Sequence, residues 1–174
     1  QGYFDLELTP ATPFPIPTND LICSNINLGT VPVGGTINNL VNYSNFCSDI
    51  EPGEPNPFID PIEQTVWFSF VAPNHVGANV TSNVTINAYS DPGGLGDLVD
   101  LQLAVYESSN NLCTGTLSEM TSEYSIADLF NEFMNVRCLE EGKTYFLMVD
   151  GSFINVQGYF DLELTPATPF PIPT

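Results

Sequence analysis

Basic residues are almost missing from this sequence. Its 174 residues include 21 Asp and Glu but only 2 Lys and Arg, which gives a formal net charge of −19 and a sequence pI near 4.1. A surface of that sign repels phosphate backbones and anionic lipid head groups. We therefore expect no nucleic-acid partner and no membrane binding through basic patches, and ion pairs can add little to stability.

Long apolar runs are also missing. None approaches the ~20 residues that a membrane-spanning helix needs, and no basic and apolar signal-peptide regions open the sequence. We expect no membrane insertion, and an export signal that lies outside the given residues. Disorder is not expected either, because 43% of the residues are hydrophobic and only 13% are charged, so one domain can bury a core.

Cysteine is scarce, with four residues at Cys23, Cys47, Cys113 and Cys138. They form no CxxC pair, and the single histidine is distant in sequence, so no zinc ligand set is evident. An even number in a chain of this kind favours disulfides and an oxidising, extracytoplasmic compartment. Three pairings are open. We favour Cys23–Cys47 with Cys113–Cys138, which close loops of similar length, and the alternative is four buried free thiols.

Catalytic patterns are missing as well. No pair of acids is set apart by its spacing as a glycosidase pair would be. A serine triad would need His75, which follows a proline turn, and no nucleophile-elbow motif is present. We expect no enzymatic activity.

An exact repeat is what the sequence does contain. Residues 1–18 and residues 157–174 both read QGYFDLELTPATPFPIPT. Identity at every position, surface residues included, indicates a period of 156 residues in a tandem array. The first copy contributes two acids, Asp5 and Glu7, so one period carries 19 acids and 2 bases, a charge of −17.

Each copy of the repeat has two halves. The first alternates apolar and polar residues, as an amphipathic strand does. Its members are Tyr3, Phe4, Leu6 and Leu8 in one copy, and Tyr159, Phe160, Leu162 and Leu164 in the other. The second half has a proline at every second or third position, which predicts a polyproline II spacer of roughly 30 Å that joins no ladder.

One domain has a single place for this strand, so one copy belongs to a neighbour. Residues 1–9 are then the last strand of the preceding covalent repeat, or a strand exchanged between successive domains. Residues 10–18 and 165–174 are predicted linkers, and residues 19–164 the folded domain.

Alternating apolar residues elsewhere predict further strands and an all-β, antiparallel jelly-roll-like sandwich. We expect the strands at residues 65–71, 79–89, 101–107, 135–139, 144–150 and 159–164. Residues 41–60 are predicted to form a long loop. Residues 125–133 show helical spacing and predict a short helix.

Four segments carry a resemblance to a known family. VWFSFVAP (residues 66–73), DLQLAVYESS (100–109), CLEEGKTYFLMVDG (138–151) and GYFDLEL (158–164) are similar to the bacterial pre-peptidase C-terminal domain. That resemblance implies a jelly-roll sandwich of the kind repeated in secreted cell-surface proteins of Bacteroidota. It implies an accessory, binding or spacer role and no shared catalytic residues.

Two kinds of site have candidate residues. Asp91, Asp97 and Asp100 flank a glycine-rich turn and offer the hard oxygen ligands that calcium prefers, although the turn can also be purely structural. N-linked sequons and proline-flanked threonines are candidate glycan acceptors. These are Asn42, Asn79 and Asn83, and Thr9, Thr12, Thr165 and Thr168.

Aromatic residues at Trp67, Phe68 and Phe70 suggest core packing more than a sugar-stacking platform. Together these features predict a structural repeat module of an extracellular, cell-surface filament or adhesin stalk, whose partners are copies of itself and possible glycans. Two alternatives stay open. One is a carbohydrate- or protein-binding module of a large secreted protein, and the other is a pilin-like subunit that assembles by strand donation.

Overall fold

The computed structural model describes residues 15–58, 61–75, 80–90, 98, 100–124, 131–152 and 156–171. These residues form a short 3-10 helix, η1, and nine strands. The elements are η1 (Ile22–Ser24), β1 (Ile26–Thr30), β2 (Ile37–Ser44), β3 (Val66–Val71), β4 (Val80–Tyr89), β5 (Leu101–Ser108), β6 (Leu117–Tyr124), β7 (Asn131–Leu139), β8 (Thr144–Gly151) and β9 (Tyr159–Pro171).

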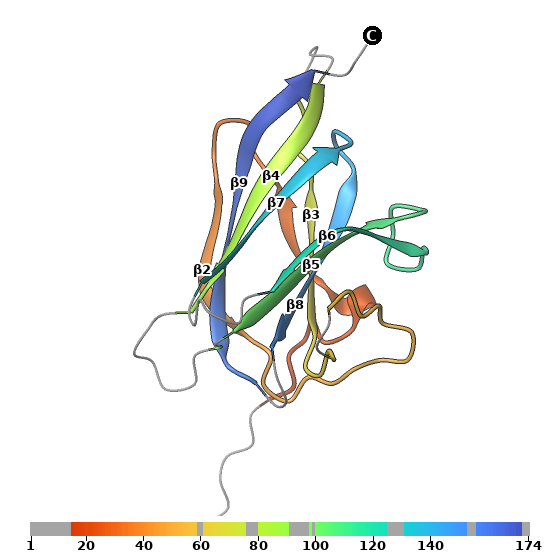
Figure 1. The fold of residues 1–174 in the computed structure, drawn as a ribbon, viewed down its shortest axis with the longest axis vertical. Helices are drawn as coiled ribbons and strands as arrows, with labels where there is room; N and C mark the ends of the chain where they lie inside the picture. The colour runs from red at the N-terminus through yellow and green to blue at the C-terminus, as the bar shows by residue number, and fades with distance from the viewer. Residues whose placement is uncertain are drawn as a thin grey trace, which may run out of the picture.

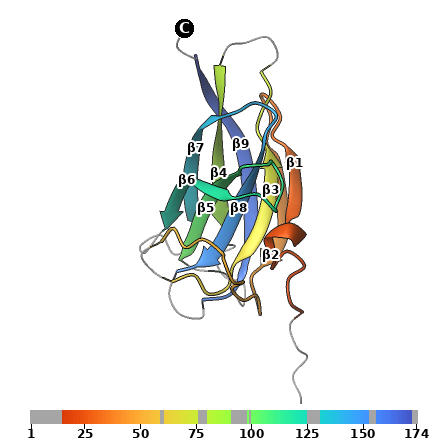
Figure 2. The same ribbon diagram turned by 90° about the vertical axis from the view of Figure 1, so that its right-hand side faces the viewer.

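The strands build two sheets that pack face to face as a β-sandwich (Figures 1 and 2). One sheet has five strands in the order β1-β3-β8-β5-β6, and the other has four in the order β2-β9-β4-β7. All pairs are antiparallel except β1 with β3. The predicted antiparallel β-sandwich is confirmed.

The main core lies between the sheets, because every second residue of each strand faces inward. Phe68, Leu103 and Ile86 are fully buried there, together with Leu162 from β9. A second, smaller core lies on the outer side of the five-stranded sheet, around Trp67. Its fully or nearly buried members are Phe58, Ile62, Trp67, Ala104, Tyr106, Phe146 and Met148.

The six predicted strands are present, but the sequence prediction missed β1, β2 and β6. The predicted loop at residues 41–60 is wrong at its start, because residues 41–44 complete β2. The predicted helix at residues 125–133 is wrong at its end, because residues 131–133 begin β7, and residues 125–130 lie outside the described part. Trp67, Phe68 and Phe70 are core residues as expected.

Candidate functional site

The repeated strand is the central functional feature, and its second copy forms β9. Residues Tyr159–Leu164 lie between β2 and β4 and pair with both, for example Leu162 with Asn39 and with Ala88. Phe160, Leu162 and Leu164 alternate inward and are at most 1% exposed. The predicted amphipathic strand is confirmed here, whereas its first copy, residues 3–8, lies outside the described part.

The proline-rich half of the repeat does not form the predicted spacer. β9 continues through it to Pro171 and pairs with β4, with Pro166 opposite Val84 and Phe170 opposite Thr81. Prolines are tolerated because β2 pairs with β9 only as far as Leu164, so the later residues form an edge that needs no amide donors on that side. β9 therefore passes the predicted domain boundary at residue 164 and extends to Pro171.

A buried asparagine locks this proline-rich half to the sheet. The Asn83 side-chain amide donates to the Thr168 carbonyl at 2.5 Å, and its oxygen accepts the Cys138 backbone amide at 3.0 Å. Asn83 is only 3% exposed. A glycan on Nδ2 would have to be accommodated at a side chain that is buried and already bonded to Thr168, so the fold disfavours this predicted glycosylation site.

The other predicted glycan acceptors have mixed positions. Asn42 and Thr168 are exposed, and Thr165 is half-buried beside Thr36, with its hydroxyl 3.2 Å from the Thr36 hydroxyl. Glycosylation at these residues stays a prediction. Asn79, Thr9 and Thr12 lie outside the described part.

The disulfide differs from both favoured pairs. Cys23, in η1, bonds to Cys113, in the loop after β5, with a Cα–Cα distance of 5.0 Å. The predicted pairs Cys23–Cys47 and Cys113–Cys138 are therefore wrong, because loops distant in sequence meet beside the outer core. Cys47 and Cys138 are free and exposed.

The predicted calcium ligands are only partly described. Asp100 lies just before β5 with a left-handed φ of 50°, and its carboxylate oxygen Oδ1 is buried with no hydrogen-bond partner among the described residues. Asp91 and Asp97 lie outside the described part, so calcium binding at this turn stays a prediction.

A different acidic cluster was not foreseen from the sequence. One carboxylate oxygen from each of Asp20, Asp49 and Glu51 lies within 4.8 Å of the others. Burial and the neighbouring carboxylate of Glu54 raise the pKa of Glu51 to about 7. Burial is also the main reason why the pKa of Asp20 is raised. Among the described residues, this is the group of acids whose geometry would suit a cation.

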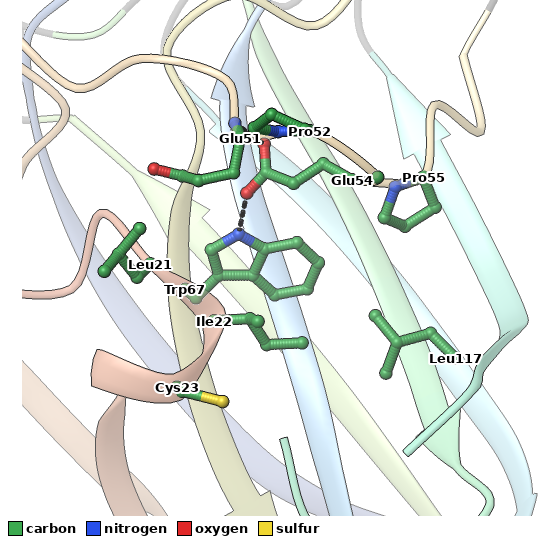
Figure 3. Close-up of a pocket in the computed structure, with 10 residues that line it drawn as sticks. Leu21, Ile22, Cys23, Glu51, Pro52, Glu54, Pro55, Trp67 and Leu117 are labelled. Atoms are coloured by element: carbon green, nitrogen blue, oxygen red, sulfur yellow. Dashed lines mark hydrogen bonds between the residues drawn. The ribbon is translucent and has the colours of Figure 1, made fainter. Parts of the chain in front are cut away.

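Next to this cluster, a cavity of about 320 Å³ opens over the edge of Trp67 (Figure 3). The indole nitrogen donates to Glu54 Oε1 at 2.5 Å, and the Thr65 hydroxyl donates to Glu54 Oε2 at 2.7 Å. Leu21, Ile22 and Leu117 supply apolar walls. Because Trp67 is 0% exposed and its ring edge is bonded to Glu54, it offers no flat face for a sugar to stack on.

A second buried carboxylate holds the chain that covers the outer core. Asp150 is 0% exposed and accepts the backbone amides of Glu63, Gln64 and Gly151 at 3.0, 3.1 and 2.8 Å. Burial dominates over these bonds and raises the pKa of Asp150 to about 6. The role of Asp150 is structural, because it fixes residues 63 and 64 over the sheet.

No family model matches the chain, and no curated protein shows significant similarity to it. Among the described residues, no helix has the length and apolar character needed to cross a membrane.

Proposed function

We propose that this chain is a structural repeat of an extracellular, cell-surface filament or adhesin stalk, covalently continuous with identical neighbours. The observation that carries the proposal is that the place for the duplicated strand is filled once, by residues 159–171, which pair with β2 and β4. The identical sequence at residues 3–15 is then best explained as the last strand of the preceding repeat. The family resemblance in the strand segments agrees with a spacer role and belongs to the same proposal.

The junction between repeats is much shorter than a proline spacer would be. Pro171 ends β9, and Pro171 of one repeat is Pro15 of the next because the two copies are identical. Asn19 is already part of the fold, since it is 4% exposed and its side-chain amide donates to the Trp67 carbonyl at 3.1 Å. Only Ile16, Pro17 and Thr18 remain as linker, which spans at most about 14 Å.

Within one domain, the point where the linker from the preceding repeat enters and the point where the linker to the next repeat leaves lie at opposite ends. β9 runs along the long axis to the top of Figure 1, whereas the first described segment, red in the colour bar, lies toward the bottom. Successive repeats would thus stack head to tail. The thirteen residues of β9 span about 40 Å, so we expect an axial period of about 40 to 55 Å once the linker is added.

The charge of the assembly fits an extended polymer. Each period carries −17, so neighbouring repeats repel each other, and added salt weakens that repulsion. Strand donation between separate subunits is less favoured, because a donated strand would have to displace a β9 that already pairs on both sides. A sugar-binding module is less favoured because Trp67 is enclosed.

Electrophoresis and imaging of the native protein test this proposal. Under reducing, denaturing conditions we expect a species far larger than one repeat, whereas a band near the 19.0 kDa of this chain would mean separate subunits. Electron micrographs should show an axial period of about 40 to 55 Å. A period longer by roughly 30 Å would instead support an extended proline spacer between the domains.

A further inference from the structure

Two thiols remain after the disulfide of the fold is formed. Cys23 and Cys113 bond to each other, while Cys47 and Cys138 are free and exposed. A compartment that oxidises the first pair also oxidises exposed thiols whenever a second thiol comes within reach. The disulfide partners of Cys47 and Cys138 therefore depend on which other thiols lie within reach.

The two free cysteines cannot reach each other within one domain. Cys47 lies beside the start of β9, where its amide donates to the Gln157 side chain at 3.3 Å. Cys138 lies beside the far half of β9, because its amide donates to Asn83, which is opposite Ala167. The stretch of β9 from Tyr159 to Ala167 alone is about 26 Å long. A disulfide requires Cα atoms less than about 7 Å apart.

Each cysteine instead lies close to one side of the junction between repeats. On the outgoing side, Asn83 connects Cys138 to Thr168, three residues before the end of β9. On the incoming side, Cys47 is two residues from Asp49, whose amide donates to Asp20 at 3.1 Å. Asp20 directly follows Asn19, the first anchored residue of the repeat.

The short linker brings these two sides together. If repeats are covalently continuous, the last residue of β9 and the next Asn19 are separated by at most about 14 Å. The end of one domain that carries Cys138 then faces the end of the next that carries Cys47. Every junction in the polymer would present the same two thiols, one from each side.

We propose that Cys138 of each repeat forms a disulfide with Cys47 of the following repeat. The inference rests on the proposed tandem array. The two thiols lose two protons and two electrons to an external disulfide of the thiol-exchange class, which is reduced to two thiols while one sulfur–sulfur bond forms. The cross-link closes a ring across each junction and restricts the bending of successive domains.

Peptide mapping of the native polymer tests the cross-link. The protein is purified without reductant, denatured in iodoacetamide and digested with chymotrypsin, which can cleave between Cys23 and Cys47 at Leu28, Tyr43 and Phe46. We expect a linked peptide pair containing Cys47 and Cys138, and almost no alkylated cysteine. Alkylation of both residues, or Cys47–Cys47 and Cys138–Cys138 pairs, would overturn the proposal.

Variants of the same polymer provide matched controls. In a Cys138→Ser polymer, Cys47 should become alkylated, at about one thiol per repeat, while the Cys23–Cys113 peptide stays linked. The Cys47→Ser polymer should expose Cys138 in the same way. Oxidised as a dilute monomer, the 174-residue chain should keep both thiols alkylatable, and a Cys47–Cys138 bond inside that monomer would contradict the inference.

The cross-link and the covalent array can fail separately. A large species on a reducing gel, found together with two alkylated cysteines per repeat, would refute the disulfide and support the covalent array. A second outcome is a non-reducing gel with bands at multiples of one chain mass that become a single band on reduction. If the linked peptide is also found, the disulfide is supported and the covalent array is refuted.

Discussion

The two outer faces of the sandwich differ in what covers them. The five-stranded sheet carries a second core under the segment between β2 and β3, which contributes Phe58 and Ile62. On the four-stranded sheet, outward residues such as Asn87, Phe133 and Glu163 stay half or fully exposed, although Asn83 is buried. One face is therefore an interior, and the other meets solvent or a neighbouring molecule.

The difference shows how an acidic chain with few bases uses its carboxylates. On the covered face, Glu54 accepts from the indole of Trp67, and Asp150 accepts from three backbone amides. On the open face, Glu163 accepts from the side-chain amide of the half-buried Asn87 at 3.2 Å. Hydrogen-bond donors of the chain itself replace the missing cations where carboxylates are buried, and water does so elsewhere.

Truncation of a core residue on the covered face should have the largest effect. Met148 is 0% exposed and packs in the second core, so Met148→Ala should lower the free energy of unfolding by about 2–5 kcal/mol. The matched change on the open face, Asn87→Ala, should cost less than about 1 kcal/mol. Equal losses in denaturant titrations would mean that the outer core is not a true interior.

Acidification should stabilise the covered face. The folded state raises the pKa of Asp150 from 3.8 to about 6, so between these values the folded chain binds a proton that the unfolded chain does not. This contribution is complete below the unfolded pKa and is lost as pH rises through about 6. From two pKa units it amounts to about 3 kcal/mol.

The measurement is the melting temperature from pH 8 to pH 5. It should rise as pH falls, and Glu51, whose pKa is about 7, adds a contribution of the same sign. Asp150→Asn should flatten the rise, whereas Asp161→Asn on the open face should leave it unchanged. A wild-type profile that parallels that of Asp150→Asn would refute the role of this carboxylate.

Neutralising Glu54 should have a smaller effect. Glu54→Gln keeps the shape but weakens the bonds from Trp67 and Thr65, so we expect a loss of about 1–3 kcal/mol. Glu163→Gln is the same chemical change on the open face and should stay within about 0.5 kcal/mol. Chemical denaturation of the two variants in parallel checks this contrast.

The sequence predicted the open sheet and the inner core better than the covered face. Strict alternation in β9, as at Phe160 and Leu162, shows directly which side is buried. Trp67 and Phe68 were assigned to the core because apolar residues on both faces indicate a covered strand. β6 was missed because it is an edge strand with no buried residue in its pattern, so no alternation identifies it.

What covers the second core could not be read from the sequence. The sequence predicted a polar loop up to residue 60, and the partners of Glu54, Asp150 and Cys23 are set by contacts between separate segments. The cysteine pairing failed for the same reason, since Cys23 and Cys113 are 90 residues apart. The proline-rich end of β9 was misjudged because a strand paired on one side leaves room for prolines that a central strand would not accept.

Two threonines offer the finest test of the contrast between faces. Thr65 is 0% exposed and donates to Glu54 at 2.7 Å, whereas Thr85 is partly exposed and donates to Asn135 at 2.9 Å. Each bond is lost when the residue becomes valine, but Thr65 is buried whereas Thr85 is partly exposed, so water replaces the lost bond more readily at Thr85. Thr65→Val should therefore lower the free energy of unfolding by about 1–2 kcal/mol, and Thr85→Val by less than about 0.5 kcal/mol. Calorimetry of both variants checks this order. The reverse order would show that the two faces differ less in hydration than their burial indicates.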